Sequence, residues 1–326
     1  MVNHLGNWKN GELGDFVTLK RGFDLPQQKR EDGQVPIFSS SGITGTHSTA
    51  MVKAPGVITG RYGTIGEVFY AAKDFWPLNT TLFVEDFHGN DAKFIYYFLK
   101  TLEWSKFTSA SAVPGINRNT VHKEIVSLPD IETQRRIAST LSMFDEKIKI
   151  NTEINDNLYA QAKAIFDNHF INIDAIPAGW RKGNLLGIAN YLNGLAMQKF
   201  RPQGNEIGLP VLKIKELRQG SCDDSSERCS LSIKPEYIIH DGDVVFSWSG
   251  SLLVDIWCGG TCGLNQHLFK VTSDVYDKWF YYLWTAHHLA RFIAIAADKA
   301  TTMGHIKREE LAKAEVLIPC EEDYTS

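Results

Sequence analysis

Long apolar runs are missing from this sequence of 326 residues. No stretch approaches the roughly 18 apolar residues that a membrane-spanning helix needs, and the first residues lack the apolar core of a secretion signal. The composition, 43% hydrophobic and 22% charged, is that of an ordinary soluble protein of two or three domains. We therefore expect a cytoplasmic protein with no membrane partner.

Cysteine is absent from the first half of the chain and scarce in the second. The five cysteines are Cys222, Cys229, Cys258, Cys262 and Cys320. An odd number confined to one half argues against a disulfide framework. Zinc-ligand spacing is also missing, since six residues separate Cys222 from Cys229 and no histidine stands at finger spacing. We expect buried or free thiols and no metal.

Positive charge is not in excess. The chain has 34 Lys and Arg against 38 Asp and Glu, a net charge of −4. A protein that holds nucleic-acid phosphates unaided is usually basic, so a nucleic-acid role requires local patches or a partner. Basic pairs do stand beside loops, at Lys20-Arg21, Lys29-Arg30 and Lys307-Arg308, although such pairs are commonly just solvated surface.

Catalytic motifs are missing as well. Residues 60–66, Gly-Arg-Tyr-Gly-Thr-Ile-Gly, resemble a phosphate loop only superficially, because no Gly-Lys-Ser/Thr follows. The glycine loop and the Asn/Asp-Pro-Pro-aromatic segment of an amino-directed methyltransferase are absent, and Pro129-Asp130 lacks the acidic-x-Lys partner of a nuclease. His287, His288 and His305 have no acid or serine at triad spacing. We predict a non-catalytic protein without a cofactor.

What the sequence does contain is a duplication. Matching segments follow in the same order in both halves: Trp8-Lys9-Asn10-Gly11-Glu12-Leu13 and Trp180-Arg181-Lys182-Gly183-Asn184-Leu185, Gly60-Arg61-Tyr62 and Phe246-Ser247-Trp248, Leu78-Asn79-Thr80 and Leu264-Asn265-Gln266, Gly115-Ile116-Asn117-Arg118 and Gly304-His305-Ile306-Lys307-Arg308. Solenoid repeats are far shorter, about 20 to 50 residues. The halves are therefore two homologous domains, each large enough for its own core.

A long helix is predicted between the two halves. Residues 131–170 contain no Pro or Gly, and Asp130 is a plausible cap. Apolar residues recur at alternating steps of four and three, interrupted only by Asn151 and Asn155, which is coiled-coil spacing. These residues are Ile137, Leu141, Phe144, Ile148, Leu158, Ala162 and Ile165. Forty residues form a rod of roughly 60 Å. The alternative, a helix packed on its own domain, fits a shorter segment better.

Shorter elements give the fold class. Strands are expected at 13–19, 35–38, 57–59, 67–70 and 81–84, and helices at 91–102, 118–125 and 274–292. The polar segment 39–49 is expected to be a loop, either without a task or reading base edges through its Ser, Thr and His side chains. The fold class is thus α/β (α+β), with two homologous globular domains separated by a coiled-coil helix.

The chain resembles the specificity subunit of type I restriction-modification systems. The resemblance rests on Trp-x-x-Gly-x-Leu at the start of each half, on 60–66, on Gly-Ile-Asn-Arg at 115–118 and above all on Leu-Pro-Asp-Ile-Glu-Thr-Gln-Arg-Arg-Ile at 128–137, and it covers essentially the whole chain. It implies two target recognition domains, 1–130 and 171–326, around a spacer helix at 131–170. Each domain is implied to read one half of a split target in double-stranded DNA.

The resemblance also implies partners. The helices of such subunits dock two adenine-specific DNA methyltransferase subunits, and a separate ATP-dependent restriction subunit completes the complex. The family usually has a second spacer helix, and the sequence stops at Ser326 where this helix would begin, so we expect either a truncated chain or a second helix supplied by another subunit. The apolar seam then requires a partner from another subunit or self-association. An alternative function is a shortened subunit that sequesters methyltransferase subunits; a self-sufficient DNA enzyme is a third possibility.

Candidate site residues follow from these loops and from the seam. No catalytic or metal-binding residue is proposed. The DNA-binding candidates are Lys20, Arg21, Ser39, Ser40, Ser41, Thr46, His47, Arg61, Tyr62, Asn79, Thr80, Asn117, Arg118, Lys213, Lys215, Ser247, Trp248, Ser249, Asn265, Gln266, His267, Lys307 and Arg308. The partner-interface candidates are Ile137, Leu141, Phe144, Ile148, Leu158, Ala162 and Ile165. Arg61 is the sharpest choice, because a guanidinium on a glycine-flanked turn is suited to a guanine edge or a phosphate.

Overall fold

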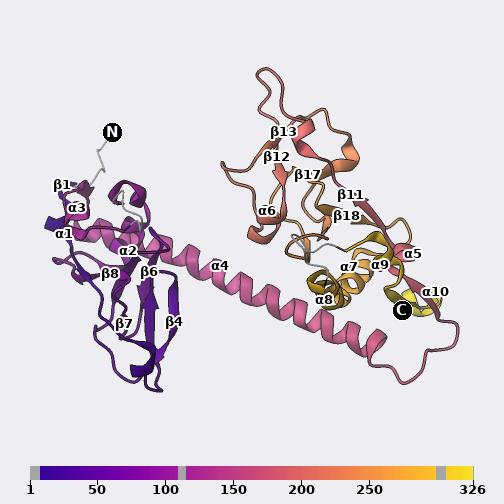
Figure 1. Ribbon diagram of the computed structural model, residues 1–326, viewed down its shortest axis with the longest axis horizontal. Helices are drawn as coiled ribbons and strands as arrows, with labels where there is room; N and C mark the ends of the chain where they lie inside the picture. Colours follow the sequence, from indigo (N-terminus) through magenta and orange to yellow (C-terminus); the bar gives the residue numbers. More distant parts are fainter. Residues whose placement is uncertain (1–7, 109–114, 299–305, 326) are drawn as a thin grey trace. The chain divides into compact units, whose positions relative to one another are not determined.

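One helix, α4 (Ile131–Phe166), runs through most of the predicted 131–170 segment (Figure 1). Its start is capped as expected, because the Asp130 carboxylate accepts a hydrogen bond from the backbone N of Thr133 at 2.9 Å. That bond is also the main reason why the pKa of Asp130 is lowered. After 36 residues α4 passes into a single π-helical segment, η3 (Asp167–Ile171). The long helix predicted from the sequence is therefore present.

The computed structural model describes residues 8–108, 115–298 and 306–325. It divides into two units, Met1–Asn155 (unit 1) and Asp156–Ser326 (unit 2). The division falls inside α4, so each unit contains part of that helix.

Unit 1 is built on three small sheets. They have the strand orders β2-β8-β5-β6, β4-β3-β7 and β1-β9. The strands are β1 (Lys9–Glu12), β2 (Thr18–Arg21), β3 (Val35–Ser39), β4 (Gly42–His47), β5 (Gly56–Gly60), β6 (Val68–Ala71), β7 (Trp76–Pro77), β8 (Thr81–Asp86) and β9 (Ile125–Leu128). The helices are α1 (Leu13–Phe16), η1 (Gln27–Lys29), α2 (Ala92–Lys100), η2 (Trp104–Phe107) and α3 (Arg118–His122).

Two cores hold unit 1 together. The larger one joins α2, α3 and the β2-β8-β5-β6 sheet through fully buried Leu13, Leu19 and Ile95. The smaller one lies between the four-stranded and three-stranded sheets and is aromatic, with Phe75 perpendicular to Phe38 at 5.7 Å between ring centroids. Burial of apolar surface of this kind is the main stabilising term for such small sheets.

Unit 2 repeats this plan. Its sheets have the orders β11-β18-β15-β16, β13-β12-β17-β14 and β10-β19. The strands are β10 (Arg181–Asn184), β11 (Asn190–Asn193), β12 (Leu209–Leu212), β13 (Arg228–Cys229), β14 (Ile238–Ile239), β15 (Val244–Ser247), β16 (Leu253–Ile256), β17 (Cys262–Leu264), β18 (Leu268–Thr272) and β19 (Glu315–Ile318). The helices are α5 (Leu185–Ile188), η4 (Met197–Lys199), α6 (Ile214–Gln219), η5 (Pro235–Tyr237), α7 (Lys278–His287), α8 (Leu289–Asp298), α9 (Arg308–Ala312) and α10 (Glu321–Thr325).

The duplication read from the sequence is confirmed by strand pairing. In unit 1 Lys9 pairs with Leu128, and in unit 2 Arg181 pairs with Ile318. The order β2-β8-β5-β6 likewise corresponds to β11-β18-β15-β16. The α/β (α+β) fold class is thus confirmed, with the same small α/β arrangement formed twice.

Three local predictions were wrong. Residues 13–19 are not one strand, because Leu13 begins helix α1, in which the backbone N of Val17 donates to the Leu13 carbonyl at 3.0 Å. Residues 39–49 are not an irregular loop, because Gly42–His47 pairs with β3 as strand β4. The single helix predicted at 274–292 is divided at His288, whose Nε2 lies 2.8 Å from the Glu315 carbonyl oxygen.

Candidate nucleic-acid interface

The turn after β5 joins several candidate residues of unit 1. The backbone N atoms of Arg61 and Tyr62 donate to the Thr80 carbonyl at 2.8 and 3.2 Å, and the backbone N of Ile116 donates to the Arg61 carbonyl at 3.0 Å. Ser40 lies against the same turn, since a Cβ at Gly60 would lie 3.1 Å from its Cβ. The structure therefore brings together Ser40, Arg61, Tyr62 and Thr80, which are far apart in sequence.

Unit 2 contains the equivalent turn after β15. The backbone N of Trp248 donates to the His267 carbonyl at 3.4 Å, and the backbone N of Ile306 donates to the Trp248 carbonyl at 3.1 Å. The strand registers agree, because Gly60 pairs with Thr81 and Ser247 pairs with Leu268. Arg61 and Trp248 therefore occupy the same position in the two units.

This equivalence corrects the alignment of the two halves by one residue. The sequence pairing matched Tyr62 with Trp248 and Leu78 with Leu264. In the structure Leu78 corresponds to Asn265, because Phe23 bridges to Leu78 as Leu195 bridges to Asn265. The sequence alignment paired Leu78-Asn79 with Leu264-Asn265 because the residue types are identical. Hydrogen bonding between strands, and not residue identity, decides which backbone positions are equivalent.

The backbone N, the carbonyl and the side chain of Arg61 all make contacts within unit 1. Its Nε donates to the Ile116 carbonyl at 3.3 Å, and its guanidinium carbon lies 4.5 Å from the centroid of the Tyr62 ring. A cation over an aromatic face is favourable by about 0.5 to 1 kcal/mol at an exposed site. Gly115 is required beside this pair, because a Cβ there would lie 2.2 Å from the Tyr62 ring. The guanidinium is thus held by the Ile116 carbonyl and the Tyr62 ring.

The other unit 1 candidates lie in three places: at polar contacts of β2 and the turn before β8, at the start of α3, and along β3 and β4. Asn79 donates to Asp24, which also lies 3.8 Å from Arg21, and Lys20 pairs with Glu85 at 2.5 Å. Asn117 caps α3 through its side chain, with Arg118 exposed at the first helical position. Further candidates lie on β3, on β4 and in the turn between them: Ser39, Ser41, Thr46 and His47.

His47 has a packing role in the fold. Only 6% of its surface is exposed, and its ring meets Trp76 edge-on at 5.1 Å. Its Nδ1 accepts a hydrogen bond from the backbone N of Glu31 at 3.1 Å. These contacts engage the imidazole within unit 1, so of the candidates on β4 Thr46 is the exposed one.

A connected polar group surrounds the unit 2 turn. Ser249 Oγ lies 3.0 Å from His267 Nδ1, and Gln266 Nε2 lies 3.4 Å from His267 Nε2. Trp248 Nε1 donates to Asn193 Oδ1 at 3.0 Å. Asn193 was missed by the sequence analysis, although it occupies in β11 the position that Arg21 has in β2.

The remaining candidates at this end of unit 2 support the turn. Ser247 is buried and donates to the Ser249 carbonyl at 3.2 Å, and buried Asn265 accepts from the backbone N of His267 at 3.1 Å. Arg308 donates to the Tyr191 carbonyl at 3.2 Å, while Lys307 is exposed at the N-cap of α9. His305, named in the sequence analysis, lies outside the described residues.

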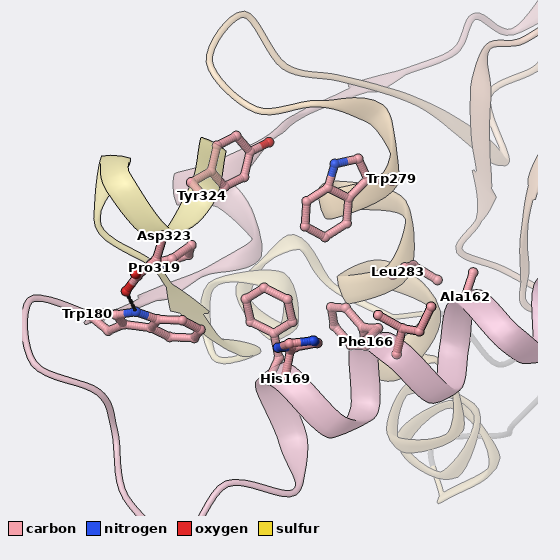
Figure 2. A pocket seen from close by; sticks show the side chains of 11 residues that line it. Ala162, Phe166, His169, Trp180, Trp279, Leu283, Pro319, Asp323 and Tyr324 are labelled. Atoms are coloured by element: carbon pink, nitrogen blue, oxygen red, sulfur yellow. Dashed lines mark hydrogen bonds between the residues drawn. The ribbon is translucent and has the colours of Figure 1, made fainter. Parts of the chain in front are cut away.

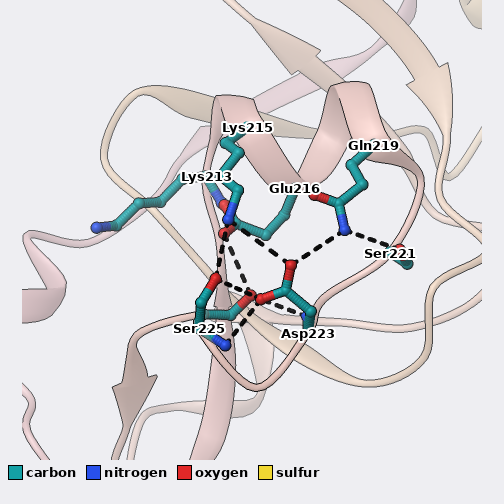
Figure 3. A network of polar contacts seen from close by, with 8 residues as sticks. Lys213, Lys215, Glu216, Gln219, Ser221, Asp223 and Ser225 are labelled. Atoms are coloured by element: carbon teal, nitrogen blue, oxygen red, sulfur yellow. Dashed lines mark hydrogen bonds and ion pairs between the residues drawn. The ribbon is translucent and has the colours of Figure 1, made fainter. Parts of the chain in front are cut away.

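Lys213 and Lys215 belong to a second polar group, at α6 (Figure 3). Lys215 Nζ donates to Ser225 Oγ at 3.0 Å and lies 3.7 Å from the Asp223 carboxylate. Asp223 also accepts from the Ser225 hydroxyl and from Gln219 Nε2, at 2.5 and 3.2 Å. The hydrogen bond from the Ser225 hydroxyl is the largest cause of the lowered pKa of Asp223. A carboxylate that stays ionised keeps Lys215 in one orientation.

The apolar seam of α4 is largely exposed. Phe144, Ile148 and Leu158 have exposed fractions of 61, 65 and 58%, and Leu141 is 37% exposed. Ile137 instead packs against the larger core of unit 1. A second exposed series, Met143, Ile150 and Ile154, follows another face of α4, which the sequence analysis missed because it followed a single stripe.

Ala162 and Ile165 lie at an aromatic pocket of about 770 Å³ in unit 2 (Figure 2). Trp279 stacks on Tyr324 at 5.9 Å between centroids, and Trp180 Nε1 donates to Asp323 Oδ2 at 2.7 Å. The pocket is lined mainly by apolar rings and has no nucleophile paired with a base. Within 8–108, 115–298 and 306–325, no cluster of metal-ligating side chains and no helix able to cross a membrane is found.

These features define a duplicated α/β protein with one polar turn at an equivalent point of each unit. Residues 6–160 match a family described as Type I restriction modification DNA specificity domain. The chain is similar to the type I restriction enzyme MjaIX specificity subunit of Methanocaldococcus jannaschii, with 24% identity over 260 residues, 71% of this chain and 59% of that protein. It is also similar to the HindI specificity subunit of Haemophilus influenzae, with 33% identity over 82 residues, 24% of this chain and 18% of that protein.

A solved structure shares the fold. The type I restriction-modification S subunit from M. genitalium has a TM-score of 0.60 to this chain at 15% identity, covering 98% of this chain and 86% of that one. Residues 6–160 therefore carry the match to the type I restriction modification DNA specificity domain, and the likeness to the solved S subunit shows a shared fold along the chain. The chain spans less than two thirds of the length of the curated relatives that it matches.

Proposed function

We propose that this chain is the DNA-recognition subunit of a type I restriction-modification complex and reads a bipartite target in double-stranded DNA. The observation that carries the proposal is the pair of equivalent turns with different side chains, Arg61 in unit 1 and Trp248 in unit 2. Equivalent backbones dock on DNA in the same way, whereas different side chains read different bases. Each unit then reads its own half-site, and the location is cytoplasmic, with the DNA.

The proposed reading surface of unit 1 centres on Arg61, Tyr62, Ser40 and Thr80. A guanidinium can donate two parallel hydrogen bonds to guanine N7 and O6, and hydroxyl groups can donate to or accept from any base. In unit 2 the corresponding surface has Trp248, Ser249, His267 and Gln266. An indole offers an apolar plane, and amide and imidazole groups both donate and accept. The other DNA-binding candidates serve as phosphate contacts or support these turns.

The proposed division of labour places the chemistry on partners. Ser249 Oγ lies 3.0 Å from His267 Nδ1, but the other ring nitrogen of His267 faces the amide of Gln266 and not a carboxylate, so this pair lacks the third member of a catalytic triad. Methylation of an adenine also requires the base to be flipped into an enzyme pocket. We assign that step to adenine methyltransferase subunits docked on α4, with a separate ATP-dependent restriction subunit in the full complex. In this proposal the length of α4, about 54 Å for 36 residues, sets the gap between half-sites.

Methylation sequencing tests the reading function. The chain is expressed with its adenine methyltransferase, and modified positions are mapped by single-molecule sequencing. We expect one motif with two constant halves and a gap of fixed length. Exchange of residues 1–128 for those of a related subunit, joined at Pro129, should change one half only. A change of both halves would contradict the two-reader proposal, and a stable complex without any methylation would favour the sequestering function.

Substitution in the seam tests the docking function. Leu141→Asp with Ile148→Asp places two charges on an exposed apolar stripe, and we expect loss of co-purification with the methyltransferase or of self-association. The matched control is Lys149→Asp with Ala160→Asp, which introduces two carboxylates at exposed positions outside the stripe. The readout is size exclusion with light scattering. Complexes of unchanged mass in both variants would rule out this stripe as the docking surface.

A further inference from the structure

Glu227 pairs with two cations at once, the DNA-binding candidate Lys213 and also Arg201. Its Oε1 lies 2.5 Å from Lys213 Nζ, and its Oε2 lies 3.0 Å from Arg201 Nη2. All three side chains are accessible, with exposed fractions of 41% for Glu227, 36% for Lys213 and 51% for Arg201. The hydrogen bond from Lys213 is the largest cause of the lowered pKa of Glu227. The carboxylate therefore stays ionised and neutralises part of this basic pair.

Other candidate cations show the same pairing. Lys20 lies 2.5 Å from Glu85, and Lys215 lies 3.7 Å from Asp223. Exposed ion pairs of this kind contribute little to folding stability, with a median of about 0 to 1 kcal/mol. Folding stability therefore does not explain why carboxylates lie beside cations on the proposed DNA-binding surface. Their effect on DNA affinity is direct, because a phosphate must displace the carboxylate or accept its repulsion.

We propose that Glu227 restrains the sequence-independent binding of this chain to DNA phosphates; the proposal rests on the DNA-reading function above. Contacts to phosphate supply most of the sequence-independent affinity of a DNA-binding protein. By holding Lys213 and Arg201, Glu227 withholds these contacts from DNA that offers nothing else. At the correct target, hydrogen bonds to bases offset the displacement of the carboxylate. Removal of Glu227 should therefore strengthen this sequence-independent binding to DNA.

Glu227→Gln tests the proposal, because it removes the charge while keeping the shape and one hydrogen-bond acceptor. The full chain is titrated with a 30-base-pair duplex of random sequence at several salt concentrations. We expect affinity to rise about three- to ten-fold, and the slope of log affinity against log salt to steepen by about 1 to 2, since each added phosphate contact contributes about 0.9. Adding Lys213→Gln to Glu227→Gln should return the slope about half of the way to that of the parent, because Arg201 remains.

Glu315→Gln is the matched control. Glu315 pairs with Lys182 at 2.8 Å, but both lie in the β10-β19 sheet, which contains no candidate reading residue. Its random-DNA affinity should match the parent. Equal effects of Glu227→Gln and Glu315→Gln, or an unchanged slope in a parent that binds DNA, would overturn the role of Glu227 alone. Absence of binding by parent and variant alike at 50 mM salt would overturn this proposal together with DNA reading by the chain itself.

Discussion

The turns after β5 and β15 have the same hydrogen-bonded backbone but different chemistry. Arg61 in unit 1 is supported by a neighbouring ring and a carbonyl, whereas Trp248 in unit 2 is supported by the amide of Asn193. The first turn presents a cation, and the second an aromatic plane among neutral donors and acceptors. The difference shows that the fold conserves the position from which a side chain projects, while the residue at that position is free to change. The hydrogen-bonded backbone of the turn therefore does not dictate which side chain stands at this position.

Gly60→Ser should have the largest effect on this comparison. Ser247 occupies the equivalent position in unit 2, yet a Cβ at Gly60 would lie 1.8 Å from the Thr64 carbonyl oxygen. The same residue is thus tolerated in one turn and excluded from the other. We expect unit 1 to lose about 3 kcal/mol of stability.

The reverse change, Ser247→Gly, is the control for this loss. It removes the hydrogen bond to the Ser249 carbonyl and should cost unit 2 about 1 kcal/mol. Hydrogen–deuterium exchange of β5 and β8 against β15 and β18 measures both effects in the full chain. Similar loss of protection in the two variants would mean that the turns are less different than their contacts indicate.

Arg61→Ala and Trp248→Ala should each weaken the reading of one half-site. We expect a loss of about 1 to 3 kcal/mol in binding to the target for either variant. The loss should disappear for Arg61→Ala when the half-site read by unit 1 is scrambled, and for Trp248→Ala when the other half-site is scrambled. Titration of four duplexes, intact or scrambled in one or both halves, gives this result. Sensitivity of both variants to the same half-site would contradict the proposal that each turn reads its own half-site.

Much of the fold could be predicted from residue patterns. The helix 131–170 was evident because only Asn151 and Asn155 interrupt its 3.5-residue apolar spacing, and the duplication was evident because its motifs keep their order. Strand β4 was not evident, since Gly42–His47 is polar and its pairing with β3 is formed at an edge. The break at His288 depends on a hydrogen bond to Glu315, which is 27 residues away in sequence. Such contacts leave no periodic signal.

The candidate surfaces were only partly predictable for the same reason. Glycine-flanked Arg61 stood out in the sequence, but the contact between its turn and Thr80 depends on the β5-β8 pairing. Asn193 and Glu227 had no local signal, because each contacts a partner that is distant in the sequence, Trp248 for Asn193 and Lys213 for Glu227. The one-residue alignment error had the same origin, since identical letters at Leu78 and Leu264 outweighed a register that only hydrogen bonds define.

Gln134 and Tyr324 form a second pair of equivalent positions in the two units. Gln134→Ala and Tyr324→Phe should reduce stability to different extents. Gln134 Oε1 accepts from the backbone N of Asp91 at 3.0 Å at the start of α2, and Tyr324 Oη accepts from that of Asp277 at 2.7 Å before α7. Gln134 is only 2% exposed and also donates to the Pro129 carbonyl at 2.9 Å, so its loss leaves buried groups unsatisfied.

We expect a cost of about 1 to 2 kcal/mol for Gln134→Ala and about 0.5 to 1 kcal/mol for Tyr324→Phe, where the ring remains in place. Exchange protection of α2 and α7 in the full chain provides the measurement. Gln134→Glu is the informative control, because it keeps the acceptor but sets a buried carboxylate against the Pro129 carbonyl, and it should cost at least as much as Gln134→Ala. A larger effect at Tyr324 than at Gln134 would show that burial does not govern this pair.

Low pH should destabilise the two units to different extents, and this difference is the smallest of the effects expected. Burial lowers the pKa of His122 in unit 1 and of His288 in unit 2 below the ordinary value of 6.5. Each ring then binds a proton more readily in the unfolded chain, so stability is full above pH 6.5 and declines as the pH falls through the lowered folded pKa. His122 Nε2 accepts a hydrogen bond from the backbone N of Leu19 at 2.8 Å, which protonation breaks. His288 lies 2.8 Å from the Glu315 carbonyl oxygen, a bond that a protonated ring still makes.

We therefore expect local protection of β2, corrected for intrinsic exchange rates, to fall more than that of β19 between pH 7 and pH 5. His122→Gln, which keeps an acceptor for Leu19 without a titrating group, should flatten the decline in β2 and leave β19 unchanged. An equal decline in the two strands, or a β2 decline that persists in His122→Gln, would assign the acid sensitivity to other groups.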